Sequence, residues 1–217
     1  MSDGASQARQ ERADAARNRR AILDATERLL STHRPQDISM EQVAAAAGVG
    51  KGTVFHRFGS RTGLMYALMA ERARALEVAV TAGPPPLGPG APERARLLAF
   101  LDAVVDVVSR NKSLLAELAH TAAAPPASQD AEGGRDKHPV YRFWHGHISA
   151  LIEAQRPGAD AAMIAHLLLG SLHSEPILRQ LSTAGPARLS AAIRTLTCAF
   201  LDAPAPAPEG SPAGGRG

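Results

Sequence analysis

The chain has 217 residues, of which 45% are hydrophobic and 21% charged, a composition typical of globular proteins and not of disordered or fibrous ones. No apolar run reaches the roughly 18 residues that span a bilayer, and the arginine-rich start lacks the apolar stretch of a secretory signal. The single cysteine, Cys198, cannot form an internal disulfide, which favours a reducing compartment. We therefore expect a cytoplasmic protein with no membrane partner.

The net charge of +3 is too small to indicate nucleic-acid binding by itself, but its distribution is uneven. Residues 1–80 carry 12 Lys and Arg against 9 Asp and Glu, whereas residues 81–217 carry 12 of each. The interval between Glu41 and Glu71 has no acidic residue and contains Lys51, Arg57 and Arg61. Because neutralisation of phosphates supplies most sequence-independent affinity for DNA, this third of the chain suits a polyanion. A solvated charge run is the alternative, although such runs normally mix both signs.

The predicted elements are all helices, because every apolar repeat follows steps of three and four residues. In chain order they cover about residues 22–33, 39–47, 50–56, 61–82, 93–110, 114–122, 138–155, 160–181 and 186–201. No segment alternates apolar and polar residues as a half-buried strand would. The predicted fold class is therefore all-α, with a small N-terminal cluster followed by a larger bundle.

Proline and glycine mark the expected domain boundaries. The stretch 83–92 (GPPPLGPGAP) cannot continue a helix and is predicted to be a linker between residues 17–82 and residues 93–203. Residues 1–16 are expected to be a disordered arm. Residues 204–217, which are rich in proline, alanine and glycine, are expected to be a disordered tail.

The interval Ser39–Phe58 has the spacing of a helix-turn-helix. Ser39 with Gln42 has the pattern of a capping box, and Gly48 can adopt the left-handed conformation of a helix exit. A second helix follows, in which Val54 is spaced to face back into the core. Such a helix places its outward N-terminal residues in the major groove of DNA. The outward-facing residues here are Lys51, Thr53, Phe55 and His56.

Several segments of this region follow one another in a specific order. They are ILDA at 22–25 followed by Leu29-Leu30, SMEQVA at 39–44, AGVGKGTVFHRF at 47–58, and Ser60-Arg61 with Leu64. Over about residues 17–70 this order resembles the N-terminal domain of the tetracycline-repressor (TetR) family. The resemblance implies a three-helix DNA-binding domain joined by a fourth helix to a helical ligand-binding and dimerisation domain. We therefore expect a non-enzymatic regulator without a cofactor: a homodimeric repressor of a palindromic double-stranded DNA operator, released by a small-molecule inducer. An activator is the alternative that the sequence leaves open.

The resemblance also assigns DNA contacts by position. They are Ser39, Lys51, Gly52, Thr53, Phe55, His56 and Arg61. The Ser39 hydroxyl and Arg61 would bind phosphates near helix starts, whereas Thr53 would donate to backbone or base. Two arginines at the start of the resemblance, Arg19 and Arg20, either reach a minor groove or only solubilise the N terminus.

Three positions depart from the family pattern. Gly50 stands where Ser or Thr is common, Phe55 where Tyr is common, and Arg61-Thr62 where Lys-Glu is common. The first two changes remove hydroxyl contacts to DNA, and the third removes an acid from a helix start. These changes do not threaten the fold, but they leave the base preference undetermined.

The helices after the linker are expected to hold a small-molecule effector, in a mostly apolar pocket with few polar groups. The candidate pocket residues are Leu101, Phe143, Trp144, His147 and His173. His147 stands on an otherwise apolar stripe, so it is either a core histidine bonded to backbone or a residue that orients a ligand. Phe143 and Trp144 would stack on a flat or cationic ligand, unless they only fill the core.

The last two predicted helices carry apolar stripes suited to dimerisation. Their candidate interface residues are Leu168, Leu172, Leu189, Ile193, Leu196 and Phe200. Two such helices from each subunit would build a four-helix interface, and its two-fold symmetry would match a palindromic operator.

Two other classes of function fit the sequence less well. A helical enzyme could use His147 or His173 with Glu175, but there is no nucleophile elbow, phosphate loop or paired acid–base motif. A purely structural adaptor would not need the acid-free interval around Lys51. We expect no metal site among the histidines, because no two lie four residues apart and there is no HExxH motif.

Overall fold

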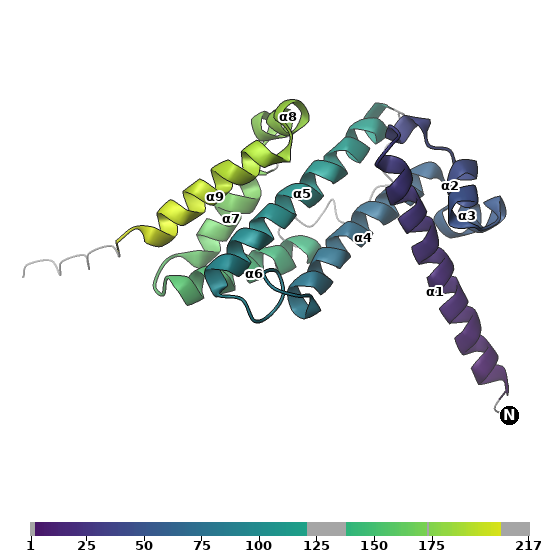
Figure 1. Cartoon of the computed structure of the whole chain (residues 1–217), viewed down its shortest axis with the longest axis horizontal. Helices are drawn as coiled ribbons and strands as arrows, with labels where there is room; N and C mark the ends of the chain where they lie inside the picture. Colours follow the sequence, from purple (N-terminus) through teal and green to yellow (C-terminus); the bar gives the residue numbers. More distant parts are fainter. Residues whose placement is uncertain (1–2, 121–137, 173, 205–217) are drawn as a thin grey trace, which may run out of the picture.

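The structure, a computed structural model, describes residues 3–120, 138–172 and 174–204. Within these residues the backbone is helical and contains no strand, which confirms the predicted all-α fold. Figure 1 shows a small N-terminal group of helices beside a longer bundle, with α4 and α5 side by side between them. The elements are α1 (Asp3–Leu30), the 3-10 helix η1 (Pro35–Asp37), α2 (Met40–Ala47), α3 (Lys51–Phe58), α4 (Arg61–Ala82), α5 (Glu93–His120), α6 (Pro139–Gln155), α7 (Ala161–Ser171), α8 (Glu175–Ala184) and α9 (Pro186–Asp202).

The N-terminal group packs around a core that α1, α2, α3 and the first half of α4 share. Ile22, Val54 and Leu64 are fully buried in this core. Helices α2 and α3 lie within the interval Ser39–Phe58, so the predicted helix-turn-helix is present.

Helix α1 extends further toward the N terminus than the sequence predicts. Residues 1–16 are expected to be disordered, but the helix begins at Asp3, and its first turns project away from the other helices (Figure 1). Because this part is exposed on nearly every side, it has no apolar stripe for a periodicity analysis to detect. It is rich in Ala, Gln and Arg, which favour helix, and Arg17 pairs with Asp14 one turn away.

The larger bundle is organised around α5, which packs against α4, α6 and α9. Phe100 of α5, Ile148 of α6 and Leu169 of α7 are fully buried in its core. Helices α6 and α9 match the predicted segments 138–155 and 186–201 to within one residue at each end.

Two other predictions in this bundle are wrong. Helix α5 is continuous, whereas the sequence suggests separate helices at 93–110 and 114–122; the polar Asn111 between them accepts a hydrogen bond from Arg72 (3.1 Å). The single helix predicted over 160–181 is divided into α7 and α8. Its break is explained by Pro176 in the first turn of α8, because proline cannot donate the hydrogen bond that a continuing helix needs.

Helix α4 belongs to both cores, so the boundary between them does not lie at the 83–92 linker. Leu64 packs in the N-terminal core, whereas Leu76, three turns later, packs in the core of the larger bundle. From the other side, Leu114 of α5 packs in the N-terminal core. The predicted domain boundary therefore matches the interruption of the helices at residues 83–92, but not the boundary between the two cores.

A polar cluster joins the two cores. Arg72 of α4 is 9% exposed and donates to Glu27 of α1 (2.9 and 3.2 Å) and to Asn111 of α5 (3.1 Å). Glu27 also pairs with Arg110 of α5 at 3.0 Å. The N-terminal group of helices is thus tied to α5 by the shared carboxylate of Glu27.

No single helix in the described part of the chain is long and apolar enough to cross a membrane. Helix α7 and residues Glu175–Leu181 of α8 meet that criterion only together, as a pair bent by 58°.

Candidate nucleic-acid interface and effector site

The turn between α2 and α3 has the predicted local geometry. The Ser39 Oγ accepts a hydrogen bond from the Gln42 amide (3.1 Å), and the Gln42 side chain accepts one from the Ser39 amide (2.7 Å). This capping box satisfies two backbone donors that the helix start would otherwise leave unpaired. Gly48 ends α2 with φ 67°, a left-handed conformation that favours glycine, and its N–H donates to the Ala44 carbonyl.

Helix α3 turns its apolar residues inward and its polar residues outward. Val54 is fully buried, whereas Phe55 keeps 40% of its surface exposed, an unusual exposure for a large aromatic residue. The other predicted contacts Lys51, Gly52 and His56 are exposed, and Thr53 is half-buried. A Cβ added at Gly52 would meet no atom within 4 Å, so packing within the chain does not require glycine there.

Lys51 has an acidic neighbour that the sequence did not reveal. Its ammonium forms an ion pair with Glu41 of α2 and lies 5.6 Å from the centre of the Phe55 ring. The hydrogen bond from Lys51 is the main reason that the pKa of Glu41 is lowered. Both side chains are more than half exposed, so salt and water screen the pair. Glu41, the acidic residue that directly precedes the acid-free interval, is therefore placed beside Lys51 by the fold.

The three predicted arginine contacts have different surroundings. Arg61, the first residue of α4, is half-buried and donates to the Pro35 carbonyl of η1, so it helps to hold the loop before α2. The Arg19 guanidinium stacks on Phe58, 5.3 Å from the ring centre. Arg20 is exposed on α1. Only Arg20 among these three has the exposure of a free surface cation.

The predicted pocket residues lie on the two helices that face each other in the larger bundle, except for His173, which is outside the described residues. Leu101 and Trp144 are buried in the core, with 3% and 7% of their surface exposed. Phe143 and His147 are half-buried. The His147 ring lies 4.7 Å from Phe100 of α5, edge to face, and 6.2 Å from Phe143, parallel to it.

Polar atoms of this region are buried without partners. The Trp144 Nε1, the His147 Nε2 and the Nε of Arg96 have no hydrogen-bond partner within the described ranges. Each such atom costs about 1–3 kcal/mol unless it is satisfied. Sequence reasoning missed Arg96; the signal was a charged residue directly before the apolar stripe that begins at Leu97. Burial, followed by the charge of Arg96, lowers the pKa of His147 below its ordinary value.

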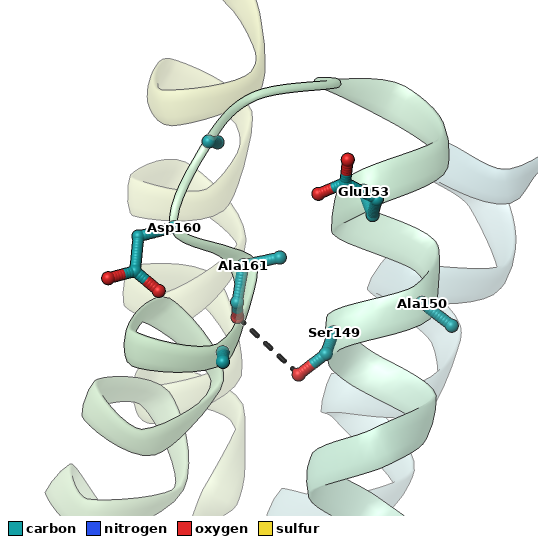
Figure 2. Close-up of a pocket in the computed structure, with 7 residues that line it drawn as sticks. Ser149, Ala150, Glu153, Asp160 and Ala161 are labelled. Atoms are coloured by element: carbon teal, nitrogen blue, oxygen red, sulfur yellow. Dashed lines mark hydrogen bonds between the residues drawn. The ribbon is translucent and has the colours of Figure 1, made fainter.

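A separate hollow lies at the surface where α6 connects to α7 (Figure 2). It is open to solvent and lined by Ser149, Ala150, Glu153, Asp160, Ala161 and their neighbours. The Ser149 hydroxyl donates to the Ala161 carbonyl across it at 3.5 Å. It contains none of the predicted pocket residues, and its small side chains offer little apolar surface to a ligand.

The residues predicted for a dimer interface differ widely in exposure. Leu172 and Ile193 are buried within the subunit itself, with 1% and 5% of their surface exposed, and so cannot contact a partner. The half-buried Leu168, Leu189 and Phe200 also pack against the bundle core. Of the predicted set, Leu196 of α9 stays exposed, at 66%. On α7, Leu167, which belongs to the predicted apolar stripe, is 66% exposed, and Met163, which sequence reasoning missed, is 52% exposed.

Histidines gather on the outer side of α6 and α7. The Tyr141 hydroxyl hydrogen-bonds His166 Nδ1 at 2.7 Å, and the His145 and His166 rings lie 4.0 Å apart. His145 Nε2 also bonds the Ala162 carbonyl (3.0 Å). Among the residues that the structure describes, no three His, Cys, Asp or Glu side chains come together as a metal site would require.

These features define a class of protein: an N-terminal helix-turn-helix on a helical bundle, as in bacterial DNA-binding regulators. The sequence matches the family described as bacterial regulatory proteins, tetR family, over residues 22–68. It is 30% identical over 183 residues to the HTH-type transcriptional regulator BetI of Cronobacter sakazakii, covering 84% of this chain and 88% of that protein. The chain therefore belongs to the TetR family; it is a DNA-binding transcriptional regulator and not an enzyme.

Further comparisons show a partial sequence match and a similar fold. The chain is 33% identical over 97 residues to SrpR of Pseudomonas putida, covering 45% of this chain and 44% of that one. A TetR-family regulator from Pectobacterium atrosepticum has a similar fold, with a TM-score of 0.53, 22% identity, and 88% and 95% of the two chains covered. A second, from Streptomyces coelicolor, has a TM-score of 0.52, 23% identity, and coverage of 82% and 96%.

Proposed function

We propose that this regulator is a homodimeric repressor that binds a palindromic operator through α3 and leaves it when a small molecule binds the larger bundle. The observation that carries the proposal is the outward face of α3. There, Lys51, Phe55 and His56 are exposed at the end of a helix-turn-helix, on a helix without an acidic residue.

In this proposal the N-terminal half of α3 enters the major groove. Gly52 leaves open space beside the backbone, which suits the close approach of a phosphate or a base edge. Without DNA, Lys51 forms an ion pair with Glu41. When DNA binds, Lys51 leaves Glu41 and pairs with a phosphate. Ser39 keeps its capping role, and its O–H can point to a phosphate while its oxygen accepts from Gln42.

A second copy of the chain is the occupant proposed for the exposed apolar residues of α7 and α9. In the described part of the chain, five large apolar side chains are exposed: Phe55, Val78, Met163, Leu167 and Leu196. Three of them lie on α7 and α9, and Phe55 belongs to the DNA-binding face. A two-fold interface places the same residues on both subunits, and the resulting symmetry matches an operator with two equal half-sites.

Helix α5 supplies the route from effector to DNA. Its first turns carry Arg96, Phe100 and Leu101 at the predicted pocket, and its later turns carry Asn111 and Leu114 at the N-terminal group. A ligand that prefers a shifted α5 therefore shifts the two DNA-binding groups of a dimer. They then no longer match successive major grooves about 34 Å apart. Only a difference in ligand affinity between the two states is needed.

The DNA-binding step is tested with the purified full chain and a pool of labelled promoter fragments at several salt concentrations. Fluorescence anisotropy should show binding that weakens linearly in log–log form as salt increases. Lys51→Ala should lower that slope by about 1, because one phosphate contact is lost. Arg142→Ala, which removes an exposed cation from α6, is the matched control and should leave the slope unchanged. If no fragment shows salt-sensitive binding by the wild type, the proposed function is wrong.

A further inference from the structure

Arg96, Trp144 and His147 each bury a side-chain nitrogen that has no hydrogen-bond partner among the described residues. Buried polar groups in folded proteins are nearly always paired with protein groups or ordered water, so these nitrogens are available to a partner from outside the chain. We propose that α5 and α6 bind an organic monocarboxylate, whose carboxylate pairs with Arg96 and His147 and whose apolar body lies against Phe100 and Phe143. This inference rests on the proposed function, because the monocarboxylate would be its effector.

The four residues that hold the ligand come in two matched pairs. Arg96 and Phe100 lie four residues apart on α5, and Phe143 and His147 lie four residues apart on α6, so each pair shares one helix face. The two faces meet at His147, whose ring lies edge-on to Phe100 at 4.7 Å and parallel to Phe143 at 6.2 Å. The imidazole thus lies between two aromatic rings, one on each helix.

Arg96 differs from the other arginines of its helix. Arg94 pairs with Asp202 at 2.5 and 2.9 Å, and Arg110 pairs with Glu27 at 3.0 Å. None of the ion pairs between described residues involves Arg96, although its Nε is buried. A guanidinium presents a planar fork of N–H donors that matches the two oxygens of a carboxylate.

The charge of the site selects one class of ligand. Burial and the nearby positive charge of Arg96 hold the pKa of His147 below its ordinary value, so the imidazole is neutral at neutral pH. The site then offers one positive charge and one neutral hydrogen-bonding group, which together compensate a single negative charge. A cationic ligand, an alternative that the aromatic residues suggested, would be repelled by Arg96. A phosphate monoester would bring a second charge with no cation to match it.

The test uses the fluorescence of Trp144, which is the single tryptophan of the chain and lies on α6 one turn before His147. The full chain is titrated with octanoate, octanol, octylammonium and octyl phosphate, which share one apolar body. Octanoate should give a saturable change and bind at least about tenfold more tightly than the other three.

Variants then locate the carboxylate. Arg96→Met should weaken octanoate binding at least about tenfold and leave octanol unchanged, and Arg96→Lys should fall between the two. Arg142→Met, on the exposed side of α6, is the matched control and should bind octanoate like the wild type. Circular dichroism melting curves show whether each variant is folded, and Arg96→Lys answers the question if Arg96→Met is not.

Besides the absence of octanoate binding, three outcomes would overturn the inference. They are equal binding of octanoate and octanol, tighter binding of octyl phosphate or octylammonium, and octanoate binding that survives both changes at Arg96. The same preparations are assayed for salt-sensitive DNA binding. A protein that binds DNA but not octanoate refutes only this inference, whereas one that binds no DNA refutes the proposed function.

Discussion

Glu27 of α1 accepts two hydrogen bonds from Arg72 of α4, at 2.9 and 3.2 Å, across 45 positions of sequence. The Arg72 side chain is 8% exposed, and its remaining contact is Asn111 of α5 at 3.1 Å. The carboxylate itself is 37% exposed and has a second partner in Arg110. The pair therefore combines a buried cation with a better solvated anion, and the two partners are not equivalent for stability.

This asymmetry predicts a larger loss of stability when the carboxylate is removed than when the guanidinium is removed. Glu27→Ala should lower the free energy of unfolding by about 3 kcal/mol, because it leaves a buried charge without its counter-ion. Arg72→Met should cost about 1 kcal/mol, since Glu27 keeps Arg110 and water. Urea unfolding measures both, with Arg110→Met as a control that should cost under about 1 kcal/mol. The reverse order would show that Glu27 is not the partner that stabilises Arg72.

Gly52 provides a second prediction, in which stability and DNA affinity change in opposite directions. Gly52→Ala should raise the free energy of unfolding by up to about 1 kcal/mol, because alanine favours helix and meets no atom within 4 Å. It should also weaken DNA binding about tenfold, since the new methyl group occupies the space proposed for DNA. The control is Gly146→Ala on α6, where the added methyl group also meets no atom within 4 Å. This variant should be stabilised equally and should bind DNA with unchanged affinity. Equal DNA binding by both variants would place Gly52 away from the DNA.

The ion pair of Lys51 with Glu41 gives a third prediction. Glu41→Gln should tighten DNA binding about threefold at low salt, because Lys51 no longer has to leave an acid and the phosphates no longer approach one. The advantage should disappear at high salt as exposed charges are screened. Anisotropy titrations at two salt concentrations measure this, with Glu77→Gln on α4 as a control of the same charge change. Weaker binding by Glu41→Gln would mean that Glu41 positions Lys51 for DNA instead of competing with it.

His147 makes the stability of the bundle depend on pH. Because its pKa is lowered in the folded chain, the unfolded chain binds a proton more readily at mildly acidic pH. The free energy of unfolding should therefore fall as pH decreases below the ordinary histidine value of about 6.5. His147→Leu should lose this part of the pH dependence in urea unfolding at pH 7.5 and 5.5. A pH profile identical to that of the wild type would show that His147 does not contribute.

The exposed apolar residues of α7 and α9 give a prediction about dimerisation. Leu167→Glu with Leu196→Glu should convert a dimer to a monomer in light scattering after size exclusion, because four charges would enter a symmetric apolar interface. Val78→Glu changes an exposed apolar residue of α4 and should leave the dimer intact. If the double variant stays dimeric, the second copy sits on another face.

The helix-turn-helix of the N-terminal group, here called the DNA-binding head, could be predicted well because the sequence features that specify it are local. The Ser39–Gln42 capping box, the left-handed Gly48 and the inward spacing of Val54 each depend on residues within one turn. The ion pair of Lys51 with Glu41 was missed because it is not local. It joins α2 and α3, and the spacing of residues in the sequence does not specify the angle between these two helices.

The larger bundle was predicted less well for the opposite reason. Its apolar stripes show that a helix is buried, but not whether the burial is against the same subunit or a partner. Ile193 and Leu196 lie on the same helix, three residues apart, yet one is 5% exposed and the other 66%. Likewise, a polar helix such as the start of α1 needs no apolar stripe, so periodicity could not reveal it.

Leu114 has a consequence for any attempt to isolate the DNA-binding head. This α5 residue, 2% exposed, fills the N-terminal core, although it lies 46 positions beyond the end of the family match at residue 68. A fragment cut after α4 would carry a Leu-sized void and would also lose Asn111 and Arg110 from the Arg72–Glu27 cluster. The head should therefore not behave as an autonomous folding unit. In the full chain it should unfold together with α5 in one cooperative transition. A fragment truncated at the linker should therefore be partly unfolded.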